Sequence, residues 1–224
     1  MKNIGLFYNP RVSTAQPLAE EIAAWLKARE IQSWICSTKE QPPEDKLCAD
    51  ATDLLVTLGG DGTILRAMPL TAPLTIPVLG LNLGRVGFLT ECMPERWPTV
   101  MTQILNGEGE IEERLMLQVT LVRDGSVVAQ DVALNDAVIS RGGLALTMRL
   151  ETRIDGAPLT RYVADGLILA TATGSTAYSY AVGGPILPPW IDNILLVPIA
   201  AHLSLDRPLV LNDEVKVDVT VHTR

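Results

Sequence analysis

Short apolar runs alternate with a segment of helical period in the N-terminal half of the chain. The run "NIGLFY" (residues 3–8) has the length of a strand. Four apolar residues then recur at helical spacing on one face: Leu18, Ile22, Trp25 and Leu26. The runs "DLLVTL" (53–58) and "IPVLGLN" (76–82) are continuously apolar, as are strands buried on both faces of a parallel sheet. This order predicts an α/β domain with a parallel sheet over residues 1–107, which binds ligands at the carboxyl ends of its strands.

From Leu115 onward the apolar period changes to two. Four apolar residues alternate with polar ones in one stretch: Leu146, Met148, Leu150 and Ile154. The pairs Asp124-Gly125 and Asp155-Gly156 are typical of tight hairpin turns. The pattern predicts a mainly antiparallel β domain over residues 108–224, entered through the charged segment "EGEIEER" (108–114). The last residues, "EVKVDVTVHTR", still alternate as a strand, so we expect the sheet to continue and this domain to be incomplete.

Composition and charge narrow the range of partners. The chain has 224 residues, of which 47% are hydrophobic, and a formal net charge of −8, so it can bury a core but does not favour nucleic acid or an anionic membrane. No apolar run approaches the roughly 20 residues of a membrane helix, and the N-terminus does not match a signal peptide, so we expect a cytoplasmic protein. Cys36, Cys48 and Cys92 lack C-x-x-C spacing and suit free thiols, and two histidines, His202 and His222, do not favour a zinc site.

The stretch "TLGGDGTILR" (57–66) places glycines and a carboxylate, Asp61, at the end of an apolar strand. Its glycines either form an Asp-Gly turn or offer N–H groups to a phosphate, and the loop by itself leaves both interpretations open. The spacing matches neither G-x-x-x-x-G-K-[ST] nor G-x-G-x-x-G, which excludes a P-loop. A second glycine-rich turn, "GLNLGRVGFLT" (80–90), follows the next strand. Two such turns on neighbouring strand ends favour a ligand-binding cleft.

A third segment, "ADGLILATATGSTAYSYAVGGPIL" (164–187), departs from the β pattern around it. Residues 167–170 have strand character, residues 171–176 are small and rich in hydroxyl groups, and "STAYSYAV" is typical of a helix start. Two interpretations are open: a helix capped by Ser or Thr, or a site where hydroxyl and N–H groups bind an anion or a nucleoside.

Together these segments resemble the NAD kinase family, whose members use ATP to phosphorylate NAD to NADP. The resemblance is carried, in the family's order, by "LGGDGT" (58–63), "GLNLGRVGFLTE" (80–91), "LNDAVISRG" (134–142), "ADGLILATATGSTAYSYAVGGPIL" (164–187) and "PIAAHLSLDRPLV" (198–210). "GGDG" is shared with lipid kinases and 6-phosphofructokinases, whereas the long fourth motif is far more specific. The resemblance implies an α/β nucleotide-binding domain followed by a β-sandwich-like NAD-binding domain.

The resemblance also implies which residues bind the substrates. Asp61 and Gly62 match the pair at the reacting ribose and phosphates, and Phe88 lies in the turn that lines the NAD pocket. The other matching positions are Asn135 and Asp136 at the ribose hydroxyls, Thr176, Ala177 and Tyr178 at the adenine, and Asp165 and Ala200 at the nicotinamide end, partly from a neighbouring subunit. The loop for the phosphates of ATP comprises Gly59, Gly60, Gly62 and Thr63.

Phosphoryl transfer mainly requires alignment of the partners and neutralisation of charge. Since the glycine loop has no lysine, we expect Mg²⁺ to bridge the phosphates of ATP rather than to occupy a site built by the protein. A carboxylate beside the attacking hydroxyl can accept its proton, which makes Asp61 the candidate catalytic base. We expect the chain to act as a homodimer or homotetramer.

Three departures from the family pattern leave alternatives open. Ala172 replaces the proline of "TPTGST", Val163 stands where a basic residue is common although Arg161 is two positions away, and the chain stops at Arg224, before a "DGQ" segment. The alternatives are a lipid or sugar kinase of the same superfamily and a non-catalytic protein that binds NAD or NADP. The "TGSTAY" stretch favours NAD kinase, because a lipid or sugar kinase has no use for it.

Overall fold

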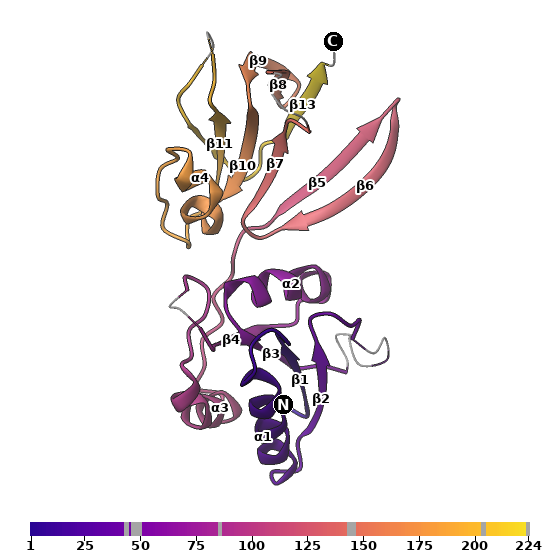
Figure 1. Ribbon diagram of the computed structural model, residues 1–224, viewed down its shortest axis with the longest axis vertical. Helices are drawn as coiled ribbons and strands as arrows, with labels where there is room; N and C mark the ends of the chain where they lie inside the picture. Colours follow the sequence, from indigo (N-terminus) through magenta and orange to yellow (C-terminus); the bar gives the residue numbers. More distant parts are fainter. Residues whose placement is uncertain (43–44, 46–50, 85–86, 143–146, 203–204, 223–224) are drawn as a thin grey trace. The chain divides into compact units, whose positions relative to one another are not determined.

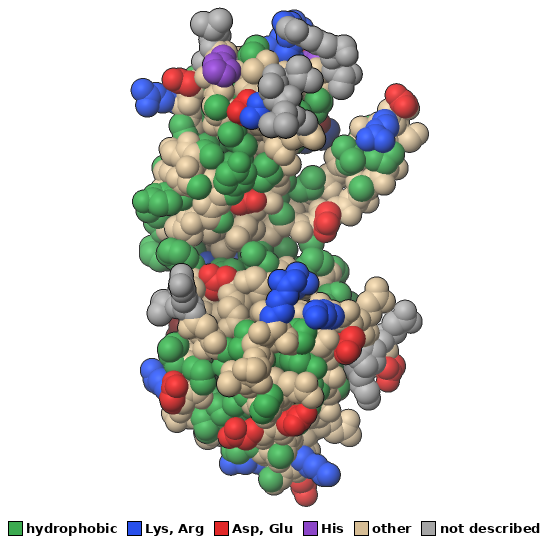
Figure 2. Space-filling view, viewed as in Figure 1, with side chains coloured by type: hydrophobic (Ala, Val, Ile, Leu, Met, Phe, Trp, Pro, Cys, Tyr) green, Lys and Arg blue, Asp and Glu red, His purple; other side chains and the backbone are tan. Residues whose placement is uncertain are grey.

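The computed structural model describes residues 1–42, 45, 51–84, 87–142, 147–202 and 205–222. The chain forms two compact units, Met1–Ile111 and Glu112–Arg224, which are drawn in Figure 1. Cys48, Leu146 and parts of the motifs at 80–91 and 198–210 lie outside the described residues. Within the described part of the chain, no helix is long and apolar enough to cross a membrane. On the face seen in Figure 2, basic side chains are interspersed with acidic ones.

Four parallel strands form the sheet of the first unit (Figure 1). They are β1 (Asn3–Tyr8), β2 (Gln32–Ser37), β3 (Leu54–Gly59) and β4 (Val78–Asn82). Their order is β2-β1-β3-β4, so β1 and β3 are central, and all six residues of β3 are buried. The continuous apolar runs therefore mark strands covered on both faces, and the predicted parallel α/β architecture is confirmed.

Helices cover both faces of this sheet. They are α1 (Ala15–Lys27), α2 (Asp61–Thr71) and α3 (Trp97–Leu105), with short 3₁₀ turns η1 (Ala72–Leu74) and η2 (Pro94–Arg96). Ile22 of α1 and Met101 of α3 belong to one apolar cluster, whereas Ala67 of α2 belongs to a second cluster that includes Leu55 of β3. Because alternate residues of β3 enter the two clusters, α2 packs on the face opposite α1 and α3.

The second unit is built from antiparallel strands, as predicted. They are β5 (Leu117–Arg123), β6 (Ser126–Ala133), β7 (Asp136–Ser140), β8 (Met148–Ile154), β9 (Ala157–Ala164), β10 (Gly166–Thr171), β11 (Asn193–Ile199), β12 (Leu209–Asn212) and β13 (Val217–His222). They form the sheets β12-β11-β10-β7 and β13-β8-β9 and the hairpin β5-β6. Two short helical turns, η3 (Thr173–Thr176) and α4 (Tyr178–Ala181), follow β10.

The two larger sheets share a core, which gives this unit its sandwich character. Leu150 and Tyr162 from β8 and β9 pack in one cluster with Leu167 and Leu196 from β10 and β11, and all four are fully buried. Fully burying an aliphatic side chain of this size contributes about 1.5–3 kcal/mol.

Both predicted hairpin turns are present. Asp124 and Gly125 have φ of 50° and 75°, and Asp155 and Gly156 have φ of 50° and 78°. Two consecutive residues with positive φ make the type I′ turn, whose twist matches that of the strands it joins.

Candidate active site

The glycine loop is a junction between a strand and a helix. β3 ends at Gly59, Gly60 is extended with φ of −128° and ψ of −169°, and α2 begins at Asp61. At Gly60 and Gly62, an added Cβ would meet no atom within 4 Å. The first N–H groups of a helix have no partner within an α-helical turn; the N–H of Thr63 donates to the carbonyl of Gly60 at 2.8 Å, and the space beside Gly60 and Gly62 is open. This arrangement favours an anion at the N-terminus of α2.

Thr63 packs against the beginning of this junction. A Cβ added at Gly59 would strike the hydroxyl oxygen of Thr63 and would lie 3.1 Å from the Cβ of Thr63 and 3.2 Å from that of Asn9, so any side chain there would displace Thr63. Thr63 is 2% exposed, and its hydroxyl, buried against Gly59, has no hydrogen-bond partner among the described residues. A buried hydroxyl without a partner costs free energy, so an acceptor that reached it would stabilise Thr63.

Asp61 faces the second glycine turn. Its Oδ2 accepts the backbone N–H of Phe88 at 2.8 Å, and its Oδ1 accepts that of Leu89 at 3.1 Å. Gly87 lies against the same carboxylate, since an added Cβ would be 2.6 Å from the Asp61 Cγ. The phenyl ring of Phe88 is 75% exposed. The structure therefore brings Asp61 and Phe88 together, whereas the roles of Gly87 and Leu89 escaped the sequence analysis.

The two glycine turns lie at neighbouring strand ends, as predicted. β3 pairs with β4, with Gly59 beside Asn82, and the N–H of Leu83 donates to the carbonyl of Gly59 at 2.7 Å. The buried Asn82 side chain accepts the N–H of Gly84 at 3.0 Å, which fixes the start of the second turn. These are carboxyl ends of parallel strands, where α/β sheets bind ligands.

In the second unit, the Asn135-Asp136 motif packs against the start of the "TGSTAY" segment. The N–H of Thr171 donates to the carbonyl of Asn135 at 2.9 Å, and the Thr171 hydroxyl accepts the N–H of Gly174 at 3.0 Å. A Cβ added at Gly174 would lie 2.8 Å from the Cα of Asn135. Backbone contacts thus hold together two motifs that lie more than 30 residues apart in the chain.

Asp136 is the partly buried carboxylate of this cluster. It opens β7, opposite Ala170 of β10. Burial raises the pKa of Asp136, because a charged carboxylate loses hydration there, and the backbone N–H of Tyr178 acts in the opposite sense. The N–H of Tyr178 links Asp136 to the first residue of α4.

Of the two interpretations of the segment after β10, the helix capped by Ser or Thr is not what the structure shows. α4 begins at Tyr178, the residue in its capping position is Ala177, and no side chain caps it. Thr176 instead ends the preceding 3₁₀ turn, so the interpretation with a Ser or Thr cap is wrong. Ala172, which replaces a proline of the family, has φ of −57°. Proline adopts nearly the same φ, so the replacement keeps the backbone conformation.

Asp165 and Ala200 lie at the other end of β10. Asp165 precedes this strand, its N–H donates to the carbonyl of Ile199 at 2.9 Å, and Ala200 follows with φ of 47°. Since Asp136 pairs with Ala170, five residues along the strand, the two groups are roughly 17 Å apart within one chain. The structure therefore does not bring Asp165 and Ala200 to the Asp136 cluster of the same chain.

Asp165 has a basic neighbour, Arg141, although Val163 stands where a basic residue is common in the family pattern. Its Nη1 is 3.2 Å from the Asp165 Oδ1, an ion pair that the sequence analysis missed. Arg161 does not take this place, because it pairs with Glu151 at 3.3 Å. The only signal for Arg141 in the sequence is its place at the end of "LNDAVISRG".

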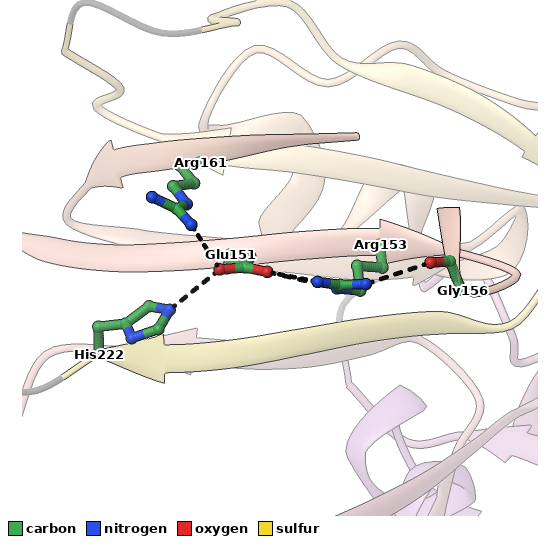
Figure 3. A network of polar contacts seen from close by, with 5 residues as sticks. All are labelled: Glu151, Arg153, Gly156, Arg161 and His222. Carbon is green, nitrogen blue, oxygen red and sulfur yellow. Dashed lines mark hydrogen bonds and ion pairs between the residues drawn. The ribbon is translucent and has the colours of Figure 1, made fainter. Parts of the chain in front are cut away.

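Glu151 is the centre of a polar network on the outer face of β8, β9 and β13 (Figure 3). It pairs with Arg153 at 3.0 Å, Arg161 at 3.3 Å and His222 at 3.4 Å. The hydrogen bond from Arg153 lowers the pKa of Glu151, and Arg161 and His222 act in the same sense. A shallow hollow of about 430 Å³ adjoins the network. These residues join three strands, so we regard the network as structural.

The described residues offer few side-chain donors for a metal ion. Across the described ranges, no three His, Cys, Asp or Glu side chains are grouped to hold a metal ion. Mg²⁺ commonly keeps several waters and binds through one or two carboxylates together with the phosphates of a nucleotide. The open space beside Gly60 and Gly62 at the N-terminus of α2 suits such a ligand.

Fold and site together define a class of protein: a two-domain phosphotransferase that acts on a nucleotide. The family model for the ATP-NAD kinase N-terminal domain matches residues 39–109, and that for the ATP-NAD kinase C-terminal domain matches residues 134–224. The chain belongs to the NAD kinase family.

Relatives over the whole chain carry the same name. An NAD kinase of Chloroflexus aggregans is 41% identical over 224 residues, covering 100% of this chain and 81% of the relative. An NAD kinase of Dehalococcoides mccartyi is 43% identical over 225 residues, covering 99% of this chain and 78% of the relative.

Two solved structures share the fold. A yeast NADH kinase complexed with NADH has a TM-score of 0.86 and 29% identity, over 99% of this chain and 72% of that one. An NAD kinase from Archaeoglobus fulgidus in complex with ATP has a TM-score of 0.76 and 29% identity, over 98% of this chain and 80% of that one.

Proposed function

We propose that this chain transfers the γ-phosphate of ATP to the 2′-hydroxyl of the adenosine ribose of NAD, giving NADP. Family membership supports the reaction, and the observation that carries its mechanism is the carboxylate of Asp61 at the N-terminus of α2. The N-terminus of a helix can bind the phosphates of the donor, and a carboxylate on the first residue of that helix can act on the hydroxyl of the acceptor.

In the first unit, Asp61 accepts the proton of the attacking hydroxyl. Gly59, Gly60, Gly62 and Thr63 hold the phosphates of ATP through backbone N–H groups and the unpartnered Thr63 hydroxyl. Phe88, exposed on the second glycine turn, contacts NAD. Positioned bases of this type contribute about 100 to 10,000-fold in rate.

In the second unit, Asn135 and Asp136 bind the vicinal hydroxyls of the ribose. Selectivity among the several hydroxyls of NAD has to come from positioning, and removing one buried hydrogen-bond partner costs about 1–3 kcal/mol. Thr176, Ala177 and Tyr178 bind the adenine. The contact between the "TGSTAY" segment and Asn135 supports this grouping.

Asp165 and Ala200 bind the nicotinamide end in a neighbouring subunit of a homodimer or homotetramer. In this arrangement one chain contributes to two sites, with Asp136 and Asp165 near opposite ends of β10. The free and buried Cys36 and Cys92 support a reducing compartment, the cytoplasm.

A Mg²⁺ ion bound with ATP would supply positive charge at the transferred phosphate. The start of α2 would hold the phosphates that carry the ion, and Asp61 would act on the hydroxyl.

A coupled assay for NADP tests the proposal. Native protein with NAD, ATP and Mg²⁺ should form NADP, and NAD with a 2′-deoxyadenosine ribose should not be phosphorylated. The same assay with polyphosphate in place of ATP defines the range of donors. Binding of NAD without any NADP formation would instead support a non-catalytic binding protein.

A further inference from the structure

Asp61 makes two hydrogen bonds that its role as a proton acceptor does not require. Both oxygens are engaged: Oδ2 by the N–H of Phe88 at 2.8 Å and Oδ1 by the N–H of Leu89 at 3.1 Å. The two donors are consecutive in the chain and lie 27 and 28 residues from the acceptor. Hydrogen bonds to an ionised acceptor are about twice as strong as neutral ones, so this carboxylate is a firm attachment point for the turn.

Gly87 makes the close approach possible. The three atoms nearest to a Cβ added at Gly87 all belong to the carboxyl group of Asp61, and the Cγ would be 2.6 Å away. Gly87 does not have a left-handed backbone angle, so space rather than conformation requires glycine there. A side chain at this position would displace either the turn or the carboxyl group of Asp61, and either movement breaks the hydrogen bonds from the N–H groups of Phe88 and Leu89.

We propose that Asp61 anchors residues 87–89 through its two oxygens and that Gly87 is a positioning residue for NAD. This inference rests on the proposed contact of Phe88 with NAD. Because the ring of Phe88 is 75% exposed, few contacts of its own fix it, and the hydrogen bond from its N–H to Asp61 sets where its backbone lies. The carboxylate of Asp61 then links the start of α2, through two hydrogen bonds, to the turn at residues 87–89 that contacts NAD.

Amide hydrogen exchange measured by NMR tests the anchor without any assay of activity. Gly87→Ala should speed exchange at Phe88 and Leu89 by about tenfold or more, because hydrogen bonds to charged groups are lost. Gly109→Ala is the matched control, since its Cβ would meet Ile104 at an ordinary 3.4 Å. Unchanged exchange at Phe88 and Leu89 in Gly87→Ala would overturn the anchor.

A double substitution separates the anchor from general disorder. Asp61→Ala removes the acceptor and also the atoms that a Cβ at position 87 would meet, so adding Gly87→Ala should produce no further increase in exchange at these two amides. Independent, additive increases from the two substitutions would contradict a shared contact.

The kinetic readout addresses positioning. Gly87→Ala should raise KM for NAD by about tenfold or more with a smaller change in kcat, because the carboxylate itself is retained. Faster exchange with an unchanged KM would overturn the positioning role. If the native protein formed no NADP at all, the proposed function would fail while the exchange results still decided the anchor.

Discussion

At the scale of single residues, three aspartates of the family motifs lie in three different environments. Asp61 accepts two backbone N–H groups, Asp136 is partly buried with a raised pKa, and Asp165 is paired with Arg141. Their proposed tasks differ because their surroundings differ. Asp61 accepts a proton, Asp136 binds hydroxyl groups, and Asp165 contacts NAD in a neighbouring subunit.

Asp136 gives a pH-dependent prediction. Since burial raises its folded-state pKa, this carboxyl contributes stability that is present at low pH and is lost as the pH rises through the folded-state value. Asp136→Asn has no such ionisation. The free energy of unfolding of Asp136→Asn, relative to that of the native chain, should therefore increase between about pH 4 and pH 7. Urea unfolding across this range checks it, and a constant difference would contradict it.

Gly174 gives a second prediction at this scale. A Cβ at this position would strike the backbone of Asn135, which cannot move without disturbing the start of β7. We expect Gly174→Ala to lower the free energy of unfolding by about 1–3 kcal/mol and to weaken NAD binding. Gly142→Ala, whose Cβ would meet nothing within 4 Å, serves as the control in urea unfolding and calorimetry.

At the scale of elements, the second unit depends on the packing between its two larger sheets. Tyr162 of β9 is fully buried in that core, and burial raises the pKa of its hydroxyl to about 12. Within the described residues, this hydroxyl has no hydrogen-bond partner. An unsatisfied buried hydroxyl weakens the packing of the ring that carries it.

Tyr162→Phe should therefore leave stability unchanged or raise the free energy of unfolding, by up to about 1 kcal/mol. The ring and its packing are retained, and only the unpartnered oxygen is removed. Urea unfolding of both proteins measures the difference. A loss of more than about 1 kcal/mol would mean that this hydroxyl has a partner in solution.

At the scale of the whole molecule, local patterns predicted the fold better than the site. The apolar runs specified the parallel sheet, and the two Asp-Gly turns specified the hairpins, because both depend on neighbours in sequence. The hydrogen bond from Phe88 to Asp61 and the ion pair between Arg141 and Asp165 link segments that are distant in sequence. The period of apolar residues therefore does not predict them. The Ser or Thr cap, one of the two interpretations of this segment, is absent from α4 because the hydroxyl-rich residues form a 3₁₀ turn before the helix begins.

The proposed division of NAD contacts between subunits predicts complementation. Asp61→Asn and Asp165→Asn should each be nearly inactive alone, because each lacks one part of every site. Mixed oligomers formed by co-expression should regain NADP formation, since one chain supplies Asp61 and its partner supplies Asp165. Absence of recovery in verified mixed oligomers would place both residues in the site of a single chain.

The most direct test of the central claim compares NADP formation by native protein, Asp61→Asn and Gly87→Ala. With saturating NAD, ATP and Mg²⁺, kcat should fall by about 100-fold or more in Asp61→Asn, because the proton acceptor is lost. In Gly87→Ala, which keeps the carboxylate, kcat should fall far less. Equal rates of NADP formation by the native protein and Asp61→Asn would contradict the account.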